Sequence, residues 1–537
     1  MSAVHSLAAM PLVAAIAGLL YLAAVPVRAL RRLASAWCLL SMPVAALAYR
    51  LWDHHVGPEP FALWRLELTP HRMAFVLPLA ALSPFFVLAS RGGGVRDGKR
   101  SQVASALACF SVAAALTAAM SDHFFLLAGM CALTTWFLIS AIVLRGSAAG
   151  RALPWVSFLA LSDLCLALGV FFFYRADPTR GLLFPPAPLR PGGAYAAACA
   201  LMLAAALLRM GLFPTHLWMP GVSRGGKDII LVHVLAVDLT LGGFLLYAVA
   251  RLVFVWGGTW TWICLGIASV SALVVSRGLL SAREGGEVTG LLCSSLGAGL
   301  AMVAAPGGQS ALAAMRVGLW AGMSAVALVE LGRGATRGGN WSKVVGGASL
   351  MGMPPLAGFA WLWLGLSALH GAFSGGMTVL FLASLPLLLA QSWIMGTTSL
   401  LVPRDGENTG GEAWLGALGL TAACVVVGLF PGAMIDLLMR EYGLPVELPV
   451  PGWRSLGAAV LLLSVPAAAL MALWARGKEA SGTTEVALSA RALPLFARGR
   501  FCGRIFASTG KTRVALVACG LILYVGWAVT MAYLALR

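Results

Sequence analysis

Charged residues are scarce in this sequence. Only 11 % of the 537 residues are charged and 60 % are hydrophobic, whereas an ordinary soluble domain carries about a quarter charged residues. A water-soluble core cannot bury so large a share of apolar side chains. The scarcity of charge therefore excludes a soluble nucleotide-binding enzyme and a disordered regulatory protein.

Paired cysteines and cysteine–histidine clusters are also missing. The ten cysteines are scattered singly, without a CxxC pair or a haem-attachment motif. This spacing excludes a disulfide-rich secreted scaffold, and it predicts neither a bound metal nor any other cofactor in this chain. The first apolar run, which starts near Ala8, has no basic residue before it, so we do not expect a cleavable signal peptide.

Long apolar runs are what the sequence has instead. Runs of about 20 residues recur along the chain, and this length crosses a hydrocarbon layer of about 30 Å. Sixteen such runs predict an all-α polytopic membrane protein with about 16 transmembrane helices. The runs cover approximately residues 8–27, 33–49, 73–90, 103–120, 123–144, 154–174, 193–213, 228–250, 259–276, 288–305, 309–332, 345–369, 377–401, 413–437, 455–475 and 514–535.

The basic residues are distributed unevenly between alternate loops. With these runs as membrane spans, 26 Lys and Arg residues lie on the side of the first interhelical loop and 10 lie on the other side. Because basic residues are retained in the cytoplasm, this bias predicts that both termini are periplasmic and that the chain lies in a bacterial inner membrane. The net charge of +17 is then a matter of membrane topology, and no nucleic acid is expected as a partner.

Prolines interrupt two of the predicted spans. Pro214 and Pro220 lie in LFPTHLWMP, and Pro354 and Pro355 lie in LMGMPPLAGF. Proline removes a backbone donor, so a broken membrane helix usually lines a cavity in which its free carbonyl groups find partners. The interrupted spans, the seventh and the twelfth, are each the fourth member of a five-helix set, which predicts two inverted five-helix repeats with a working site between them. The alternative is that prolines are simply more common in membrane helices.

The runs and loops divide the chain into six segments. The expected segments are transmembrane helices one to three (1–102), the first five-helix repeat (103–250), the second five-helix repeat (251–401), helices fourteen and fifteen (402–475), a basic segment (476–512) and the last transmembrane helix (513–537). Arginines are interspersed with apolar residues in the basic segment, which predicts that it lies on the cytoplasmic membrane surface against anionic lipid. A disordered linker is the alternative.

The two proline motifs resemble a known family. FPTHLWMP at 213–220 and GMPPLAGF at 352–359 are similar to the two broken helices of the antiporter-like, proton-conducting membrane subunits of respiratory complex I. The same family includes multi-subunit cation/proton antiporters, membrane-bound hydrogenases and the membrane partner of a two-component inorganic-carbon transporter. The resemblance extends over about residues 70 to 440, with a further match at Asp163 in SDLCLALG. It implies a subunit that translocates protons or another cation and couples this movement to redox chemistry or solute uptake by partner membrane subunits.

The sequence departs from the family at the positions that carry charge. The family has ionisable residues at mid-membrane: a Glu in the fifth span, a Lys in the seventh, a His or Lys in the eighth and eleventh, and a Lys or Glu in the twelfth. The neighbouring motifs align the Glu with Cys131, the seventh-span Lys with Arg209, and the last two positions with Val326 and Leu362. Arg209 keeps its charge but cannot release a proton. The second repeat therefore has no charge at the aligned positions.

A few ionisable residues remain inside or at the edges of the predicted spans. Each is a candidate, because a charge at the centre of a bilayer costs several kcal/mol unless it is paired or hydrated. The candidates for an ion pathway are Asp163, Arg209, His216, His233 and Asp238, and the secondary candidates are Lys227, Asp228, Arg316 and Glu330. Asp238 lies deep in its span, five residues after His233 and opposite the broken seventh helix. The alternative is a buried Asp238–Arg209 pair that only holds two helices together.

Two hypotheses about function remain open from the sequence. In the first, the chain conducts protons or another cation through the first repeat only and has no catalytic site of its own, although its complex can be a quinone-reducing or hydrogenase-type oxidoreductase. In the second, it is a degenerate, non-conducting structural subunit of the same type of complex. The remaining charges have plainer interpretations: Glu330 is expected to pair with Arg333 at a helix end, and Arg316 is expected to extend toward the outer surface.

Overall fold

The computed structural model describes residues 2–25, 30–52, 66, 70–90, 98–144, 149–176, 193–224, 226, 228–253, 258–282, 284–306, 308–334, 340–353, 356–371, 378–401 and 411–429. All of these residues belong to the unit Met1–Leu448, and the unit Pro449–Arg537 lies outside the described residues. The predicted basic segment 476–512 and the last two predicted spans lie outside them as well.

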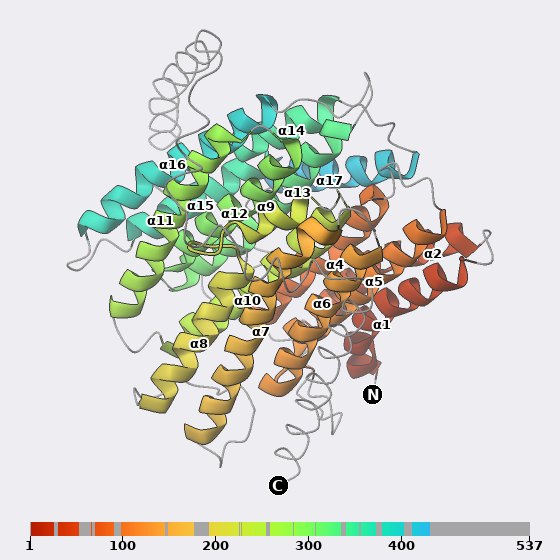
Figure 1. Cartoon of the computed structure of the whole chain (residues 1–537), viewed down its shortest axis with the longest axis horizontal. Coiled ribbons are helices and arrows are strands. Elements are labelled where there is room, and N and C mark those ends of the chain that lie inside the picture. The colour runs from red at the N-terminus through yellow and green to blue at the C-terminus, as the bar shows by residue number, and fades with distance from the viewer. Residues whose placement is uncertain are drawn as a thin grey trace. The chain divides into compact units, whose positions relative to one another are not determined.

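The described secondary structure is helical (Figure 1). Apart from one isolated β-bridge between Leu66 and Ser121, the described residues contain no strand. The helices are α1 (Ser2–Ala23), α2 (Leu30–Leu39), α3 (Ser41–Trp52), α4 (Pro70–Ser90), α5 (Gly98–Met120), α6 (Phe124–Leu144), α7 (Ala149–Ala176), α8 (Gly193–Arg209), α9 (Trp218–Ser223), η3 (Ile229–Leu239), α10 (Thr240–Val253), α11 (Gly258–Ser281), α12 (Gly285–Ala304), α13 (Gly308–Gly334), α14 (Asn340–Leu350), α15 (Ala357–Gly371), α16 (Thr378–Leu401) and α17 (Gly411–Leu429). The all-α prediction is thereby confirmed for this part of the chain.

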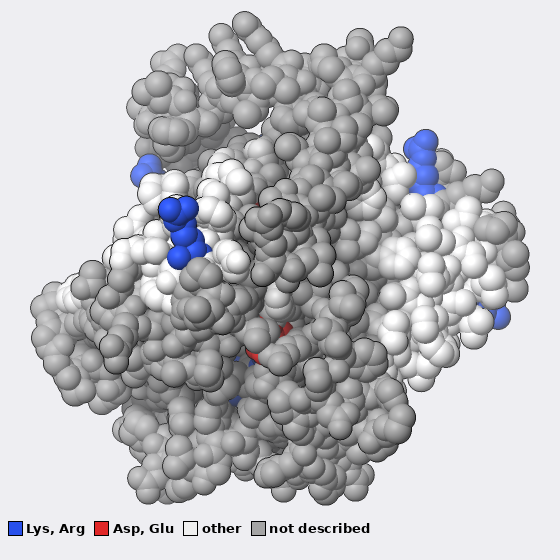
Figure 2. Space-filling view, turned by 90° about the horizontal axis from the view of Figure 1, so that it is seen from below, with Lys and Arg blue, Asp and Glu red and all other residues white. Residues whose placement is uncertain are grey.

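Described helix is present in each of the first fourteen predicted spans. Nine stretches of this helix are long and apolar enough to cross a membrane. On the face seen in Figure 2, the described surface is mostly uncharged, with isolated Lys and Arg side chains. The total of sixteen spans and the inverted relation of the two repeats stay predictions.

The second predicted span consists of two helices rather than one. α2 ends at Leu39 and α3 begins at Ser41. Pro43 lies in the first turn of α3, and since it has no N–H to donate to the Leu39 carbonyl, the two helices do not continue into each other. The Ser41 hydroxyl donates to the carbonyl oxygen of Ala80 at 3.2 Å and so connects α3 to α4.

The seventh predicted span is broken between α8 and α9. α8 ends at Arg209 and α9 begins at Trp218. Gly211, in the turn after α8, has φ = 65°, a conformation that favours glycine. Pro214 follows a cis peptide bond within this turn. Pro220 lies in the first turn of α9 rather than at the break, because the start of a helix tolerates proline.

The twelfth predicted span is broken in the same way. α14 ends at Leu350, α15 begins at Ala357, and Gly352 between them has φ = 77°. Each break begins with a Met-Gly pair, and in each the residue after the glycine donates its N–H to a carbonyl five residues back at 3.0 Å. Pro354 and Pro355 lie outside the described residues. The two breaks share a backbone pattern, as an internal repeat would.

The eighth predicted span begins as a π-helix, η3, and continues without interruption as α10. Every residue of η3 is buried. In a π-helix the N–H of one residue bonds the carbonyl five residues back, so residues five apart lie one turn apart. His233 and Asp238 are therefore neighbours along the helix axis, a relation that an α-helix with 3.6 residues per turn would not give.

Four helices meet at the end of α8. α8 packs against α7 and α10, and η3 packs against α6. The close approach of α10 depends on Gly242, because a Cβ at this position would lie 2.5 Å from Met210 Cγ. This packing brings polar side chains of α6, α7 and η3 to the last residue of α8.

Candidate functional site: a buried Asp–Arg–Asp triad

Arg209 is the last residue of α8, and its side chain is fully buried. A cation is favoured at this end of a helix because the last carbonyl groups carry a partial negative charge. A buried guanidinium presents five N–H donors, and leaving them without acceptors is costly. The neighbouring helices supply acceptors for the two terminal nitrogens, Nη1 and Nη2, whereas Nε has no partner among the described residues.

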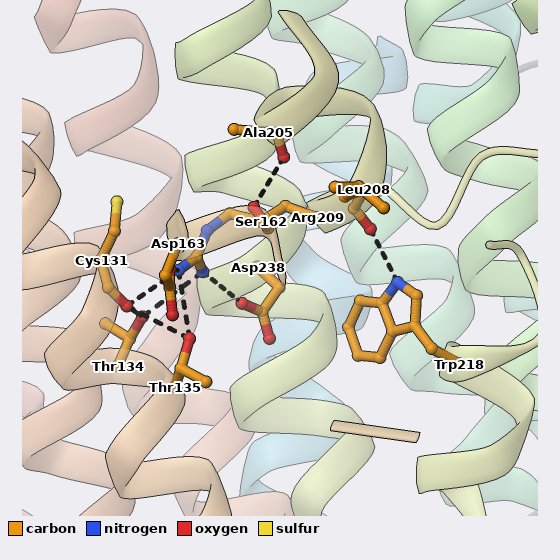
Figure 3. A network of polar contacts seen from close by, with 10 residues as sticks. All are labelled: Cys131, Thr134, Thr135, Ser162, Asp163, Ala205, Leu208, Arg209, Trp218 and Asp238. Carbon is orange, nitrogen blue, oxygen red and sulfur yellow. Dashed lines mark hydrogen bonds and ion pairs between the residues drawn. The ribbon is translucent and has the colours of Figure 1, made fainter. Parts of the chain in front are cut away.

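Two aspartates bind the Arg209 guanidinium from two different helices (Figure 3). Nη2 of Arg209 lies 2.5 Å from Oδ1 of Asp163 on α7, and Nη1 lies 2.7 Å from Oδ1 of Asp238 on η3. The side chain of Asp163 is 15 % exposed and that of Asp238 is 3 % exposed. We refer to Asp163, Arg209 and Asp238 as the triad.

Helix α6 adds further acceptors for the guanidinium. Nη2 of Arg209 donates to the carbonyl oxygen of Cys131 at 2.8 Å and to Oγ1 of Thr135 at 3.2 Å, and Nη1 donates to Oγ1 of Thr134 at 3.4 Å. Cys131, which the resemblance aligns with a family Glu, thus contacts the cation through its backbone. Neither threonine was predicted from the sequence. Their spacing of three and four residues from Cys131 puts them on one helix face and could have identified them.

One guanidinium cannot balance two ionised carboxylates. With Asp163 and Asp238 both ionised the triad carries a net charge of −1, and with one of them protonated it is neutral. Because a guanidinium stays protonated in proteins, a proton that enters or leaves this site binds to a carboxylate and not to Arg209. An uncompensated charge is expensive in a buried site. The arrangement can therefore bind one proton or one small cation.

The two candidate histidines lie in different surroundings. His233 is buried on η3, one turn before Asp238. His216 lies in the turn between α8 and α9, with its ring stacked on Phe213 at a centroid distance of 6.0 Å. Its carbonyl oxygen accepts a hydrogen bond from the Ser294 hydroxyl of α12 at 3.0 Å. Among the described contacts, none joins the His216 side chain to the triad.

The secondary candidates are not part of the triad. Lys227 lies outside the described residues, and Asp228 is the partly exposed residue that precedes η3. Arg316 is fully buried in α13, which corrects the expectation that its guanidinium extends to the outer surface, since the helices around α13 cover it.

Glu330 lies in a separate buried ion pair. Nη1 of Arg333 lies 2.6 Å from Oε2 of Glu330. The Thr289 hydroxyl of α12 donates to the same carboxylate oxygen at 2.5 Å and accepts from Arg333 at 2.8 Å. The expected pairing of Glu330 with Arg333 is confirmed. Both residues are buried, 1 % and 3 % exposed, and Thr289 connects the pair to α12.

The second break has no arginine at the corresponding position. When the Met-Gly pairs of the two breaks are matched, Leu350 takes the place of Arg209. Val326 and Leu362, which the resemblance aligns with charged residues, are buried apolar side chains. The described residues also contain no group of three His, Cys, Asp or Glu side chains placed to hold a metal ion.

Part of this chain resembles a curated protein. NADH-quinone oxidoreductase subunit N of Geobacter metallireducens is 26 % identical over 190 residues, which are 34 % of this chain and 41 % of the relative. The chain thus matches less than half of the length of this relative. No family model matches the sequence.

Solved structures of three membrane complexes contain chains with a similar fold. A chain of the membrane-bound sulfane sulfur reductase, an archaeal respiratory membrane complex, matches with a TM-score of 0.68 and 17 % identity over 80 % of this chain and 77 % of its own length. A chain of the Mrp complex from Dietzia sp. DQ12-45-1b matches with a TM-score of 0.71 and 17 % identity, over 99 % and 63 %. A chain of respiratory complex I from Thermus thermophilus matches with a TM-score of 0.61 and 21 % identity, over 80 % and 99 %.

These likenesses establish the fold as that of a multi-pass membrane protein. The resemblance to the antiporter-like membrane subunits, stated above from the proline motifs, is confirmed.

Proposed function

We propose that the chain is an antiporter-like membrane subunit of an energy-converting complex and that it passes protons through the triad. The observation that carries this proposal is the pairing of two carboxylates with one buried guanidinium. A structural ion pair needs only one carboxylate. The second gives the site a place for a proton that can bind and leave.

The exposure of the two carboxylates suggests their order in the route. Asp238 is buried and lies one turn from His233 on η3, whereas Asp163 keeps 15 % of its side chain exposed. His233 is the type of side chain that most readily exchanges a proton near neutral pH. In this proposal the proton moves between His233 and Asp238 in the buried part of the site. It leaves through the more exposed Asp163.

Partner membrane subunits supply the driving reaction in this proposal. The similar chains come from a sulfane sulfur reductase, an Mrp complex and respiratory complex I; the reductase and complex I support redox chemistry by other subunits. We further propose a bacterial inner membrane location with periplasmic termini, the six segments given above, and anionic lipid against residues 476–512. A reporter fused after Lys343 should be cytoplasmic and one at the C-terminus periplasmic; the reverse pattern would contradict this topology.

A non-conducting structural subunit is the second candidate function. The apolar Val326, Leu350 and Leu362 favour it, because three positions that could carry charge in the second repeat carry none. In that case Asp163, Arg209 and Asp238 would only fix α7, α8 and η3 to one another.

The variant Asp238→Asn separates the two functions. It removes the charge of one carboxylate while a hydrogen-bond acceptor for Arg209 remains, so the complex should still assemble. Proton movement, measured with a pH-sensitive dye in vesicles that contain the whole complex, should be abolished. Assembly together with normal proton movement would favour the structural subunit.

A further inference from the structure

Ser162, the residue before Asp163 on α7, binds the backbone of α8. It is fully buried, and its hydroxyl donates to the carbonyl oxygen of Ala205 at 2.8 Å (Figure 3). Ala205 lies four residues before Arg209, so in an α-helix the same carbonyl oxygen accepts the N–H of Arg209. Two consecutive residues of α7 thus hold the end of α8, Ser162 through this carbonyl oxygen and Asp163 through Nη2 of Arg209.

Apolar packing alone does not fix the height of α8 against α7. Eight of the 17 residues of α8 are alanines, and such small side chains let two helices approach closely but form only low ridges that interlock weakly. Gly169 of α7 shows the close approach, because a Cβ there would lie 3.1 Å from the carbonyl oxygen of Ala198. The hydrogen bond from Ser162 therefore has a part in setting this height.

The height matters because of the geometry of Arg209. A guanidinium is planar and presents its N–H groups in fixed directions. Nη2 lies 2.5 Å from Asp163 and Nη1 lies 2.7 Å from Asp238. One cation therefore meets both carboxylates only when α7 and η3 stand at matching heights beside the end of α8.

We propose that Ser162 is a positioning residue of the triad, which holds Asp163 at the height where Arg209 binds both aspartates. The inference rests on the proposed function, since the triad is the site that binds the proton there. Within the described contacts the Ser162 hydroxyl binds no side chain of the triad, so Ser162 acts through the placement of Asp163.

Removing the hydroxyl should slow proton movement without preventing assembly. In Ser162→Ala the Ala205 carbonyl oxygen keeps the N–H of Arg209, so no buried group loses its last partner. Proton movement in vesicles that contain the whole complex should fall about fivefold, the factor that corresponds to one lost neutral hydrogen bond. Ser157→Ala is the matched control, because the Ser157 hydroxyl donates within α7, to the Pro154 carbonyl oxygen at 2.6 Å; it should conduct like wild type.

A double-mutant cycle separates positioning from a plain bond between two helices. Substitutions within one network of contacts change stability non-additively. If Ser162 acts through Asp163, the shift of the unfolding midpoint in Ser162→Ala, measured on the complex in detergent, should be at most about half as large when Asp163→Asn is already present. An equal shift in both backgrounds would overturn the proposal, because Ser162 would then only join α7 to α8.

Trp218→Phe is the matched control for this cycle. Trp218 Nε1 donates to the carbonyl oxygen of Leu208 at 2.8 Å, so its hydrogen bond has the same length as that of Ser162 and also ends near the last turn of α8 (Figure 3). This bond joins α8 to α9 and includes no residue of α7. The shift that Trp218→Phe causes should therefore be equal with and without Asp163→Asn.

The outcomes separate this inference from the proposed function. Proton movement that is abolished in Asp238→Asn but unchanged in Ser162→Ala would leave the triad in place and overturn the positioning role. If the wild-type complex moves no protons at all, the proposed function is wrong, while the double-mutant cycle still decides whether Ser162 positions Asp163.

Discussion

The two broken spans of this chain have a common backbone and different chemistry. Each leaves its first helix at a Met-Gly pair with a glycine at positive φ, 65° at Gly211 and 77° at Gly352. The residue before the pair is Arg209 in one and Leu350 in the other. At the first break, Arg209 binds two carboxylates. Near the second, the described polar contacts are neutral, such as the one between Ser349 and Cys424 at 3.3 Å.

The helix break and the charge next to it are therefore separate properties of these two spans. The break is a matter of backbone conformation, because Gly211 and Gly352 have positive φ values at which any other side chain is strained whatever space surrounds it. The fold therefore requires glycine at both breaks. Charge at the end of the preceding helix is required at neither, so its presence at Arg209 is a reason to look for function there.

Replacing both Arg209 and Leu350 with methionine should give the largest difference in assembly and proton movement between the two breaks. Arg209→Met removes the cation between Asp163 and Asp238, and breaking a buried ion pair destabilises by about 3–5 kcal/mol. We expect both assembly and proton movement to be lost. Leu350→Met keeps an apolar side chain of similar volume, so it should cost less than about 1.5 kcal/mol and leave proton movement unchanged.

The measurements for this pair are the yield of the intact complex and dye-detected proton movement in vesicles. Equal losses in Arg209→Met and Leu350→Met would contradict the comparison, because they would make the two breaks equivalent. Normal movement in Arg209→Met would remove the triad from the transport route.

A smaller effect is expected at Glu330, a buried carboxylate of the predicted second repeat. Glu330→Gln leaves the buried Arg333 guanidinium without that counter-charge, so the apparent stability of the complex should fall by about 3 kcal/mol. Proton movement should be unchanged in complexes that assemble, because Glu330 pairs with a single cation and Thr289. Unfolding in detergent, monitored by fluorescence, measures the stability of the complex. The vesicle assay measures proton movement.

Glu284→Gln is the matched control for this prediction. Glu284 lies 3.8 Å from Arg224 in an exposed pair, with side chains 72 % and 40 % exposed. Exposed pairs contribute about 0–1 kcal/mol, so little change in stability is expected. A loss of proton movement in Glu330→Gln, but not in Glu284→Gln, would extend the proton route to the second repeat through charged groups.

The sequence predicted the helices and the breaks because both depend on local properties. Hydropathy located the apolar runs, and the prolines marked where a backbone donor is missing. The split of the second span at Leu40 was missed, although Pro43 signals it. Asp163, Arg209 and Asp238 were predicted as members of one ion pathway, but a direct pairing was considered only for Asp238 and Arg209, because periodicity within α7 does not show which neighbour its polar face meets.

The π-helix could not be predicted from the sequence either. Arguments from sequence spacing assume 3.6 residues per turn, and with that spacing His233 and Asp238 lie on different faces. Ser162 was overlooked for another reason. Serine is common where membrane helices pack, and only the structure shows that the Ser162 hydroxyl binds the Ala205 carbonyl oxygen.

The smallest effect is expected from the hydroxyl groups of α6, the helix in which Cys131 takes the position of the family Glu. Thr135→Val keeps the shape of the side chain but removes the oxygen that lies 3.2 Å from Arg209 Nη2. One hydrogen bond to a charged group is worth about 1.5–3 kcal/mol, and Arg209 Nη2 retains Asp163 and the Cys131 carbonyl oxygen. We therefore expect a loss of stability at the lower end of this range.

Proton movement in Thr135→Val should fall by less than about tenfold. A full loss of about 1.5–3 kcal/mol would lower it tenfold or more, but Arg209 Nη2 keeps its other acceptors. Ser140→Ala is the control on the same helix, because the Ser140 hydroxyl donates to the Trp136 carbonyl oxygen at 2.9 Å, away from the triad. A loss in Thr135→Val as large as that in Arg209→Met would show that α6 contributes more than one hydroxyl to the site. No difference from Ser140→Ala would mean that the two aspartates alone hold the guanidinium in its working position.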